Sequence, residues 1–154
     1  MKIIIDTCIW SEALRKNKKS LKSEENDSMS QEKIKFQEKI NMELKELIFE
    51  NRIVMLGLIR QELLSGIKDE KIFELIKEKL KSFEDYKVET EDYEQAAKMF
   101  NVCRKHGIQG SNTDYLICSI AVRNNFGIFT TDDDFKNYAK YLPIVLHKIR
   151  KHGD

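Results

Sequence analysis

The stretch Met1-Lys2-Ile3-Ile4-Ile5-Asp6-Thr7 opens the chain and decides its fold class. Its three isoleucines form an unbroken β-branched run, which is typical of a strand buried on both faces. An acid and a hydroxyl residue follow this run at once. A strand buried on both faces indicates a parallel sheet covered by helices, and the acid marks the edge at which the strand ends.

Further apolar runs continue this pattern along the chain. Strands are predicted at 52–56, 126–130 and 143–146, with a weaker candidate at 86–88. Amphipathic helices are predicted between them, because apolar residues recur there at helical spacing. Two such inward faces are Phe36, Ile40, Leu44, Leu47 and Ile48, and Tyr93, Ala96, Ala97, Phe100 and Cys103. We expect an α/β fold, a three-layer α/β/α sandwich around a central parallel sheet of four to five strands.

The composition fits a single domain spanning residues 1–154, with 41% hydrophobic and 34% charged residues. No apolar run approaches membrane-spanning length and no signal peptide is evident, so we expect a cytoplasmic protein with no membrane partner. The polar stretch 17–31 is predicted to be a flexible insertion within the domain. Three scattered cysteines exclude a complete disulfide framework and are predicted to be buried thiols, whereas the three histidines are predicted at the surface.

Four acids lie next to the predicted strands. Asp6 ends the first strand, and Asp132 follows the strand at 126–130. Glu62 lies in the helix after the second strand, and Asp114 opens the helix that leads into the strand at 126–130. Each acid alone is commonly a helix cap or a surface residue. The carboxyl ends of parallel strands share one edge of the sheet, so we expect the four acids to converge in one crevice there.

Converging carboxylates suit a metal centre. Without a counter-ion they would repel one another and raise each other's pKa. Hard divalent cations such as Mg²⁺ or Mn²⁺ prefer oxygen ligands and would remove that repulsion. A cation held in this way can activate water and screen a phosphate, which favours phosphodiester hydrolysis. The sequence carries no GxSxG motif, and we find no Cys–His pair that would favour a covalent nucleophile.

Four segments, which extend over nearly the whole chain, contain these acids: Ile3-Ile4-Ile5-Asp6-Thr7, Arg60-Gln61-Glu62-Leu63-Leu64-Ser65-Gly66, Thr113-Asp114-Tyr115-Leu116-Ile117-Cys118-Ser119-Ile120-Ala121 and Thr130-Thr131-Asp132-Asp133-Asp134-Phe135. Together, and in this order, they resemble the PIN-domain nucleases, and VapC-type ribonuclease toxins of toxin–antitoxin pairs in particular.

The resemblance implies roles for single residues. Asp6, Glu62 and Asp114 match the metal-binding and catalytic acids, and Asp132 matches the fourth. Asp134 is the alternative fourth acid or a supporting residue, whereas Asp133 is expected to face solvent. Thr7 and Thr130 match hydroxyl positions that support the metal site.

The resemblance also implies an activity and its partners. It implies a Mg²⁺- or Mn²⁺-dependent endoribonuclease that acts on RNA, is inhibited by a cognate antitoxin and forms a homodimer. Two alternatives remain open: a PIN nuclease that processes RNA without being a toxin, and a PIN-like module that binds RNA or protein without cutting. The sequence does not decide whether one or two ions bind.

Overall fold

The computed structural model describes the backbone of residues 1–19 and 30–151, and the side chains of 1–15 and 30–151. Its elements alternate between short strands and longer helices, as the sequence predicts. In chain order they are β1 (Ile3–Ile5), α1 (Thr7–Lys19), α2 (Gln31–Phe49), β2 (Ile53–Val54), α3 (Gly57–Leu64), α4 (Glu70–Leu80), α5 (Thr90–Lys105), α6 (Asn112–Asn124), β3 (Gly127–Phe129), α7 (Asp134–Tyr138) and β4 (Val145–Leu146).

The four strands form one parallel sheet in the order β2-β1-β3-β4. β1 lies inside the sheet, where Ile3 is in register with Ile53 on one side and Gly127 on the other. The weaker candidate at 86–88 forms no strand, and only an isolated bridge joins Met55 to Asp85 nearby. The predicted parallel sheet is therefore confirmed with four strands.

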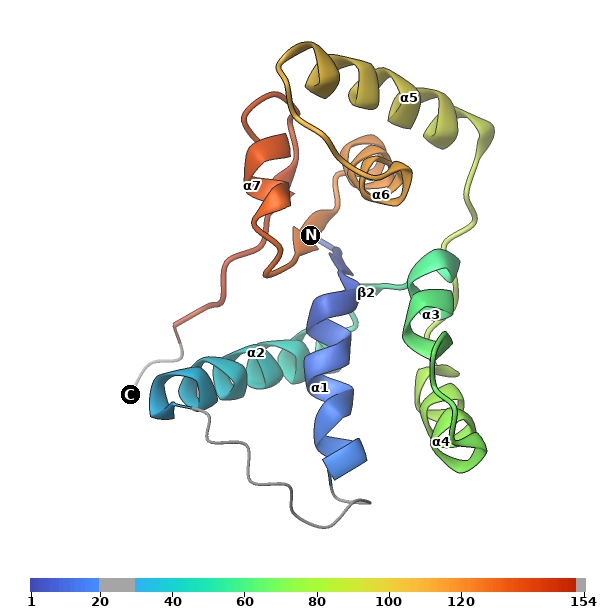
Figure 1. Cartoon of the computed structure of the whole chain (residues 1–154), viewed down its shortest axis with the longest axis vertical. Coiled ribbons are helices and arrows are strands. Elements are labelled where there is room, and N and C mark those ends of the chain that lie inside the picture. The colour runs from blue at the N-terminus through green and yellow to red at the C-terminus, as the bar shows by residue number, and fades with distance from the viewer. Residues whose placement is uncertain (20–29, 152–154) are drawn as a thin grey trace.

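Helices cover both faces of the sheet. In Figure 1, α1 and α2 lie on one side of the strands, and α5, α6 and α7 lie on the other. Crossover connections between parallel strands are right-handed, so helices change face when the chain reverses its direction across the sheet. The chain steps from β1 to β2 in one direction and from β2 past β1 to β3 in the other. This connectivity produces the predicted three-layer sandwich.

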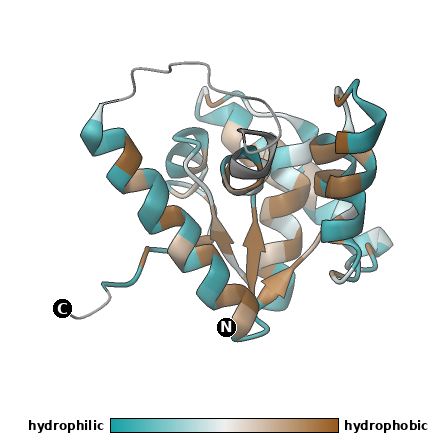
Figure 2. Cartoon of the chain, turned by 90° about the horizontal axis from the view of Figure 1, so that it is seen from below, coloured by the Kyte–Doolittle hydropathy of each residue, from teal (hydrophilic) through white to brown (hydrophobic). Residues whose placement is uncertain are grey.

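The strands form the centre of the hydrophobic core. Ile4 and Ile5 of β1 and Ile128 of β3 are fully buried. Figure 2 shows these strands in the hydrophobic colour between helices with mixed surfaces. Because β1 is enclosed on both faces, its three isoleucines need no polar residue between them.

Helix α2 extends beyond the core that it covers. Ile40, Leu44 and Leu47 are buried as predicted, but Phe36 is 51% exposed and Ile48 is 38% exposed, so their predicted burial is wrong. A helix of 19 residues spans about 28 Å, whereas a strand of three residues spans about 10 Å. Periodicity identifies the inward face of a helix, but it does not say how far the core reaches along it.

Helix α5 is rotated from its predicted orientation. Ala96 and Cys103 are buried as predicted, but Ala97 and Tyr93 are exposed, the latter by 57%. Asp92 is fully buried instead, because its carboxylate accepts a hydrogen bond from the Glu89 backbone N–H and pairs with Arg123. A paired acid has taken a place on the buried face that periodicity alone assigns to apolar residues.

The burial of the cysteines and histidines differs in part from the prediction. Cys103 and Cys118 are buried, Cys8 is half-buried, and all three are free thiols. His106 is exposed, as predicted, and its ring stacks on Tyr141. His147 is not a surface residue, since its side chain is only 10% exposed. His152 lies outside the described residues.

The predicted insertion at 17–31 is described only at its two ends. The backbone of residues 17–19 continues α1, and residue 31 is the first of α2. The Ser30 side chain caps α2 by accepting a hydrogen bond from the backbone N–H of Lys33. Residues 20–29 lie outside the described part, so their flexibility stays a prediction. No helix in the described ranges is both long and apolar enough to span a bilayer.

Glu43 ties the C-terminal segment to α2. Its carboxylate is fully buried, and Oε1 lies 2.6 Å from His147 Nε2 and accepts a 2.9 Å hydrogen bond from Arg150 Nε. Burial alone would raise the pKa of Glu43, but the hydrogen bonds from His147 and Arg150 outweigh it and hold the pKa below 4.5. Folding therefore favours the charged form of this acid.

We expect Glu43→Gln to lower the free energy of unfolding at pH 7 by about 2 kcal/mol, because it leaves a cation without its buried partner. A folded-state pKa below the unfolded one stabilises the protein above about pH 4.5, and this contribution is lost as the pH falls through the folded-state pKa. Urea unfolding at a series of pH values, from pH 7 down through the folded-state pKa of Glu43, measures both the loss of unfolding free energy and its dependence on pH. The exposed Glu38→Gln on the same helix is the control, and equal losses in the two variants would contradict the assignment.

Candidate metal centre

Asp6 lies at the carboxyl end of β1 and is 8% exposed. Its backbone N–H donates to the carbonyl of Phe129, which fixes it beside the end of β3. Its carboxylate accepts hydrogen bonds from the Thr7 backbone N–H at 2.8 Å and from Thr130 Oγ1 at 2.7 Å, and a weaker one from the Cys8 thiol at 3.6 Å. These bonds set the orientation of a carboxylate that is largely removed from solvent.

Thr7 connects this strand end to α3. It is the first residue of α1, and its Oγ1 donates a 2.5 Å hydrogen bond to Oε2 of Glu62. Glu62 is exposed and lies in the last half of the eight-residue helix α3. Two acids that are distant in sequence, Asp6 and Glu62, are thus held by neighbouring groups of one short segment.

The segment between β3 and α7 holds two more acids. The Asp132 backbone N–H donates to Thr130 Oγ1 at 3.0 Å, so the hydroxyl that binds Asp6 also shapes this loop. Asp132 Oδ1 in turn accepts a 2.9 Å hydrogen bond from the backbone N–H of Asp134. Asp133, in contrast, is 84% exposed and pairs with Lys136, as expected for a solvent-facing residue.

Asp114 lies in the first turn of α6 and is half-buried. Its Oδ2 accepts a 2.7 Å hydrogen bond from the hydroxyl of Tyr138, a fully buried residue of α7. Burial raises the pKa of Asp114 above 3.8; the Tyr138 hydrogen bond opposes this rise, and the charges of Asp6 and Asp132 add to it. Burial and, to a smaller extent, the neighbouring negative charges thus disfavour the charged form of Asp114.

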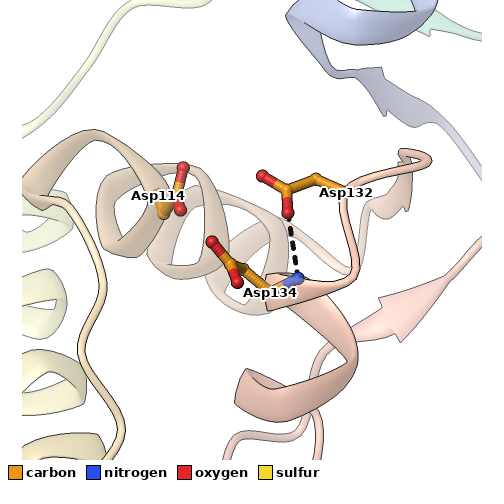
Figure 3. Close-up of side chains that lie close together, drawn as sticks. All are labelled: Asp114, Asp132 and Asp134. Atoms are coloured by element: carbon orange, nitrogen blue, oxygen red, sulfur yellow. Dashed lines mark hydrogen bonds between the residues drawn. The ribbon is translucent and has the colours of Figure 1, made fainter.

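Three of these carboxylates meet most closely. One oxygen from each of Asp114, Asp132 and Asp134 lies within 4.8 Å of the other two. Figure 3 shows Asp114 on α6 facing Asp132 and Asp134 at the start of α7. Of the residues described, Asp6 and Glu62 fall outside this triplet and connect to it through Thr7 and Thr130. We name the five acids together the acid cluster.

The acid cluster fits a divalent cation. Its ligand atoms are all carboxylate oxygens, the class that Mg²⁺ and Mn²⁺ prefer. Among the residues whose side chains are described, the ion pairs engage other acids, and no lysine or arginine of that part neutralises this cluster. The described groups that bind it are neutral hydroxyls, the Cys8 thiol and backbone N–H groups, which orient carboxylates while leaving their charge available to a metal.

Sequence reasoning missed two residues at this site. Tyr138 binds Asp114 directly, and its only sequence signal is its position four residues after Asp134. Cys8 lies with its Sγ 3.6 Å from Asp6 Oδ2 and 3.5 Å from Thr130 Oγ1. Its half-buried thiol donates a weak hydrogen bond to the Asp6 carboxylate and lies beside the hydroxyl that holds it.

Gly110 leaves room for the two tyrosine hydroxyls beside Asp114. A Cβ at this position would lie 2.5 Å from the Tyr138 hydroxyl and 2.8 Å from the Tyr115 hydroxyl. Both rings are buried, so they have little space to retreat. Glycine is therefore required here by close packing.

The α/β/α sandwich with acids at its strand ends is the arrangement expected of a PIN domain, and the comparison with protein families agrees with this expectation. The family model for the PIN domain matches residues 3–141. The chain therefore belongs to the PIN domain family. The comparison with curated proteins finds no match.

Solved structures share this fold over almost the whole chain. FitAcB from Neisseria gonorrhoeae is 17% identical with a TM-score of 0.66, and the match covers 95% of this chain and 96% of that one. VapBC2 from Rickettsia felis, bound to a promoter DNA fragment, is 18% identical with a TM-score of 0.69, covering 96% and 98%. FitAB bound to the IR36 DNA fragment is 14% identical with a TM-score of 0.63, covering 98% and 99%. At these identities the similarity establishes the fold alone.

We expect Tyr138→Phe to raise the pKa of Asp114 further in the metal-free protein, because it removes a hydrogen bond that favours the charged carboxylate. Carboxyl carbon NMR across the acid range measures this pKa directly. The exposed Tyr141→Phe serves as the matched control and should leave it unchanged. An Asp114 pKa that stays the same in Tyr138→Phe would show that the hydroxyl does not hold this acid.

Proposed function

We propose that this protein is a metal-dependent endoribonuclease that hydrolyses RNA phosphodiester bonds. The observation that carries the proposal is the close triplet Asp114, Asp132 and Asp134 in a PIN domain, to which hydrogen bonds through Thr130 and Thr7 connect Asp6 and Glu62. Uncompensated carboxylates at such an edge suit a Mg²⁺ or Mn²⁺ site. A PIN fold with its acids in place favours a nuclease over a module that only binds.

The proposal assigns a role to each acid of the cluster. Asp6, Glu62, Asp114 and Asp132 would hold the cation, and Asp134 is a supporting ligand or the alternative to Asp132. When bound, the cation would activate water and stabilise charge on the phosphate.

Three hydroxyls would position the acids before substrate arrives. Thr130 orients Asp6, Thr7 orients Glu62, and Tyr138 orients Asp114, each through one hydrogen bond of 2.5–2.7 Å. Partners that orient metal ligands in this way commonly change metal affinity or activity by about 10- to 100-fold when they are removed. Because each acid is held from a different element, the cluster can keep its geometry when a cation binds.

We expect cleavage of single-stranded RNA to require Mg²⁺ or Mn²⁺ and to stop in EDTA. Asp6→Asn and Glu62→Gln should each lower kcat/KM by at least about a hundredfold, since loss of a ligand exceeds loss of a residue that supports one. Glu78→Gln, on an exposed part of α4, should cleave like the unaltered protein. Cleavage that persists in EDTA and in Asp6→Asn would refute the metal-dependent mechanism.

We further propose that the nuclease is the toxin of a toxin–antitoxin pair in the cytoplasm. The resemblance to VapC-type toxins supports this role, as does the shared fold with the FitAB and VapBC2 structures. The antitoxin would be a small protein that blocks the acid cluster, and self-association would occur away from it. An RNA-processing PIN nuclease is the competing proposal.

Growth assays separate these two roles. Expression of the chain should arrest growth, Asp6→Asn should relieve the arrest, and co-expression of the adjacent gene product should restore growth. The measurement is the colony count with each gene under separate induction. Normal growth during expression of an active nuclease would instead favour an RNA-processing enzyme.

A further inference from the structure

A hollow of about 260 Å³ adjoins the acid cluster. It lies between α2 and the segment from β3 to α7, and β4 contributes to its wall. We call it the Phe36 hollow. Its lining residues are Phe36, Thr130, Thr131, Asp132, Asp133, Lys136 and Leu146. It shares Thr130 and Asp132 with the site described above, so a group bound in the hollow would lie beside the acids.

The two parts of this lining differ in chemistry. Phe36 and the half-buried Leu146 supply apolar surface. Thr131 supplies a hydroxyl, which among the described residues donates only to the weakly accepting Cys8 Sγ at 3.4 Å. This hydroxyl can therefore exchange its partner for a ligand atom. The hollow suits a flat ligand with an apolar face and a polar edge.

The ring of Phe36 is not part of the hydrophobic core. It is 51% exposed on the part of α2 that extends beyond the sheet, and its chain neighbours Lys35 and Gln37 are polar. An isolated exposed aromatic residue needs no explanation in itself. The Phe36 ring, however, lies in the wall of a hollow that shares Asp132 with the candidate nuclease site. An exposed ring in that place forms a surface on which a base can stack.

We propose that the Phe36 hollow binds one unpaired nucleobase of the RNA substrate, with the base stacked on the Phe36 ring next to the phosphate that is cut. This inference rests on the proposed ribonuclease function. Every base has a π-face for stacking and a polar edge for hydrogen bonds, which matches the two parts of the lining. The volume is below the roughly 300–1,000 Å³ of pockets for drug-sized ligands, so it suits one base.

Lys136 completes the nucleotide site. Its ammonium group lies 2.9 Å from Asp133 Oδ1, and both side chains are more than 70% exposed. Ion pairs between such exposed groups are weak, so the ammonium can turn to the phosphate of the bound nucleotide. Bases in a duplex are already paired and stacked, so this site selects RNA that is single-stranded at the cut.

Steady-state cleavage of a short single-stranded RNA with Mg²⁺ tests the base site. Phe36→Ala should raise KM about tenfold with a smaller change in kcat, because stacking contributes to substrate binding. Phe36→Trp should retain the KM of the unaltered protein. Phe49→Ala is the matched control: it lies on the same helix about 20 Å away, is 92% exposed and should cleave normally. Thermal unfolding should give similar Tm values for all of these variants.

RNA with single abasic positions gives a second readout. If the base is removed at the position that occupies the hollow, Phe36→Ala and the unaltered protein should have the same KM. In Phe36→Trp combined with Asp6→Asn, RNA should quench tryptophan fluorescence beyond any change in Asp6→Asn alone, whose single Trp10 is only 3% exposed.

The outcomes separate this inference from the function on which it rests. An unchanged KM in Phe36→Ala, or an equal rise in Phe49→Ala, overturns the base site while leaving the nuclease intact. A KM defect that is the same at every abasic position also overturns it, because the ring would then act without a base. If the unaltered protein cuts no RNA with Mg²⁺, the proposed function fails and the base site fails with it.

Discussion

The hydroxyl of Thr130 joins the two inner strands of the sheet at the edge where the acids lie. It donates to Asp6 at the end of β1 and accepts from the backbone of Asp132 after β3. The parallel register that pairs Ile5 with Phe129 brings these two strand ends level. From this point the loop turns through Asp132 to Asp134, and the triplet with Asp114 follows. Displacement of this hydroxyl would therefore alter how Asp6 lies relative to Asp132 and the triplet.

The chain treats its acids in two different ways. Away from the cluster, buried acids are neutralised by arginine, as Asp92 is by Arg123 and Glu43 is by Arg150. At the cluster, the partners are hydroxyls and backbone N–H groups, which leave the negative charge in place. The first arrangement fastens helices and the C-terminal segment. The second keeps the carboxylates of Asp114, Asp132 and Asp134 close together with their charge in place, and a bound cation would stabilise that charge.

Features that follow from short sequence patterns could be predicted, whereas contacts that depend on how helices pack in the folded protein could not. The isoleucine run specified β1 and the parallel sheet, and the strand-end rule placed Asp6, Asp114 and Asp132 at one edge. The assignment of catalytic roles to them stays a prediction. Tyr138 was missed because its bond to Asp114 depends on how α7 packs against α6. Phe36 was misplaced because the length of the core does not appear in helical periodicity.

The close packing at Gly110 makes this position depend on Tyr115 and on the more distant Tyr138. The space for a Cβ at residue 110 is already taken by the hydroxyls of Tyr138 and Tyr115. A chain that carries alanine here must move both tyrosine rings, and a displaced Tyr138 hydroxyl would no longer support the acid on α6. Across homologous chains, positions 110 and 138 should therefore vary together. Covariation between a glycine and a tyrosine would then reveal a supported metal ligand in sequences for which no structure is known.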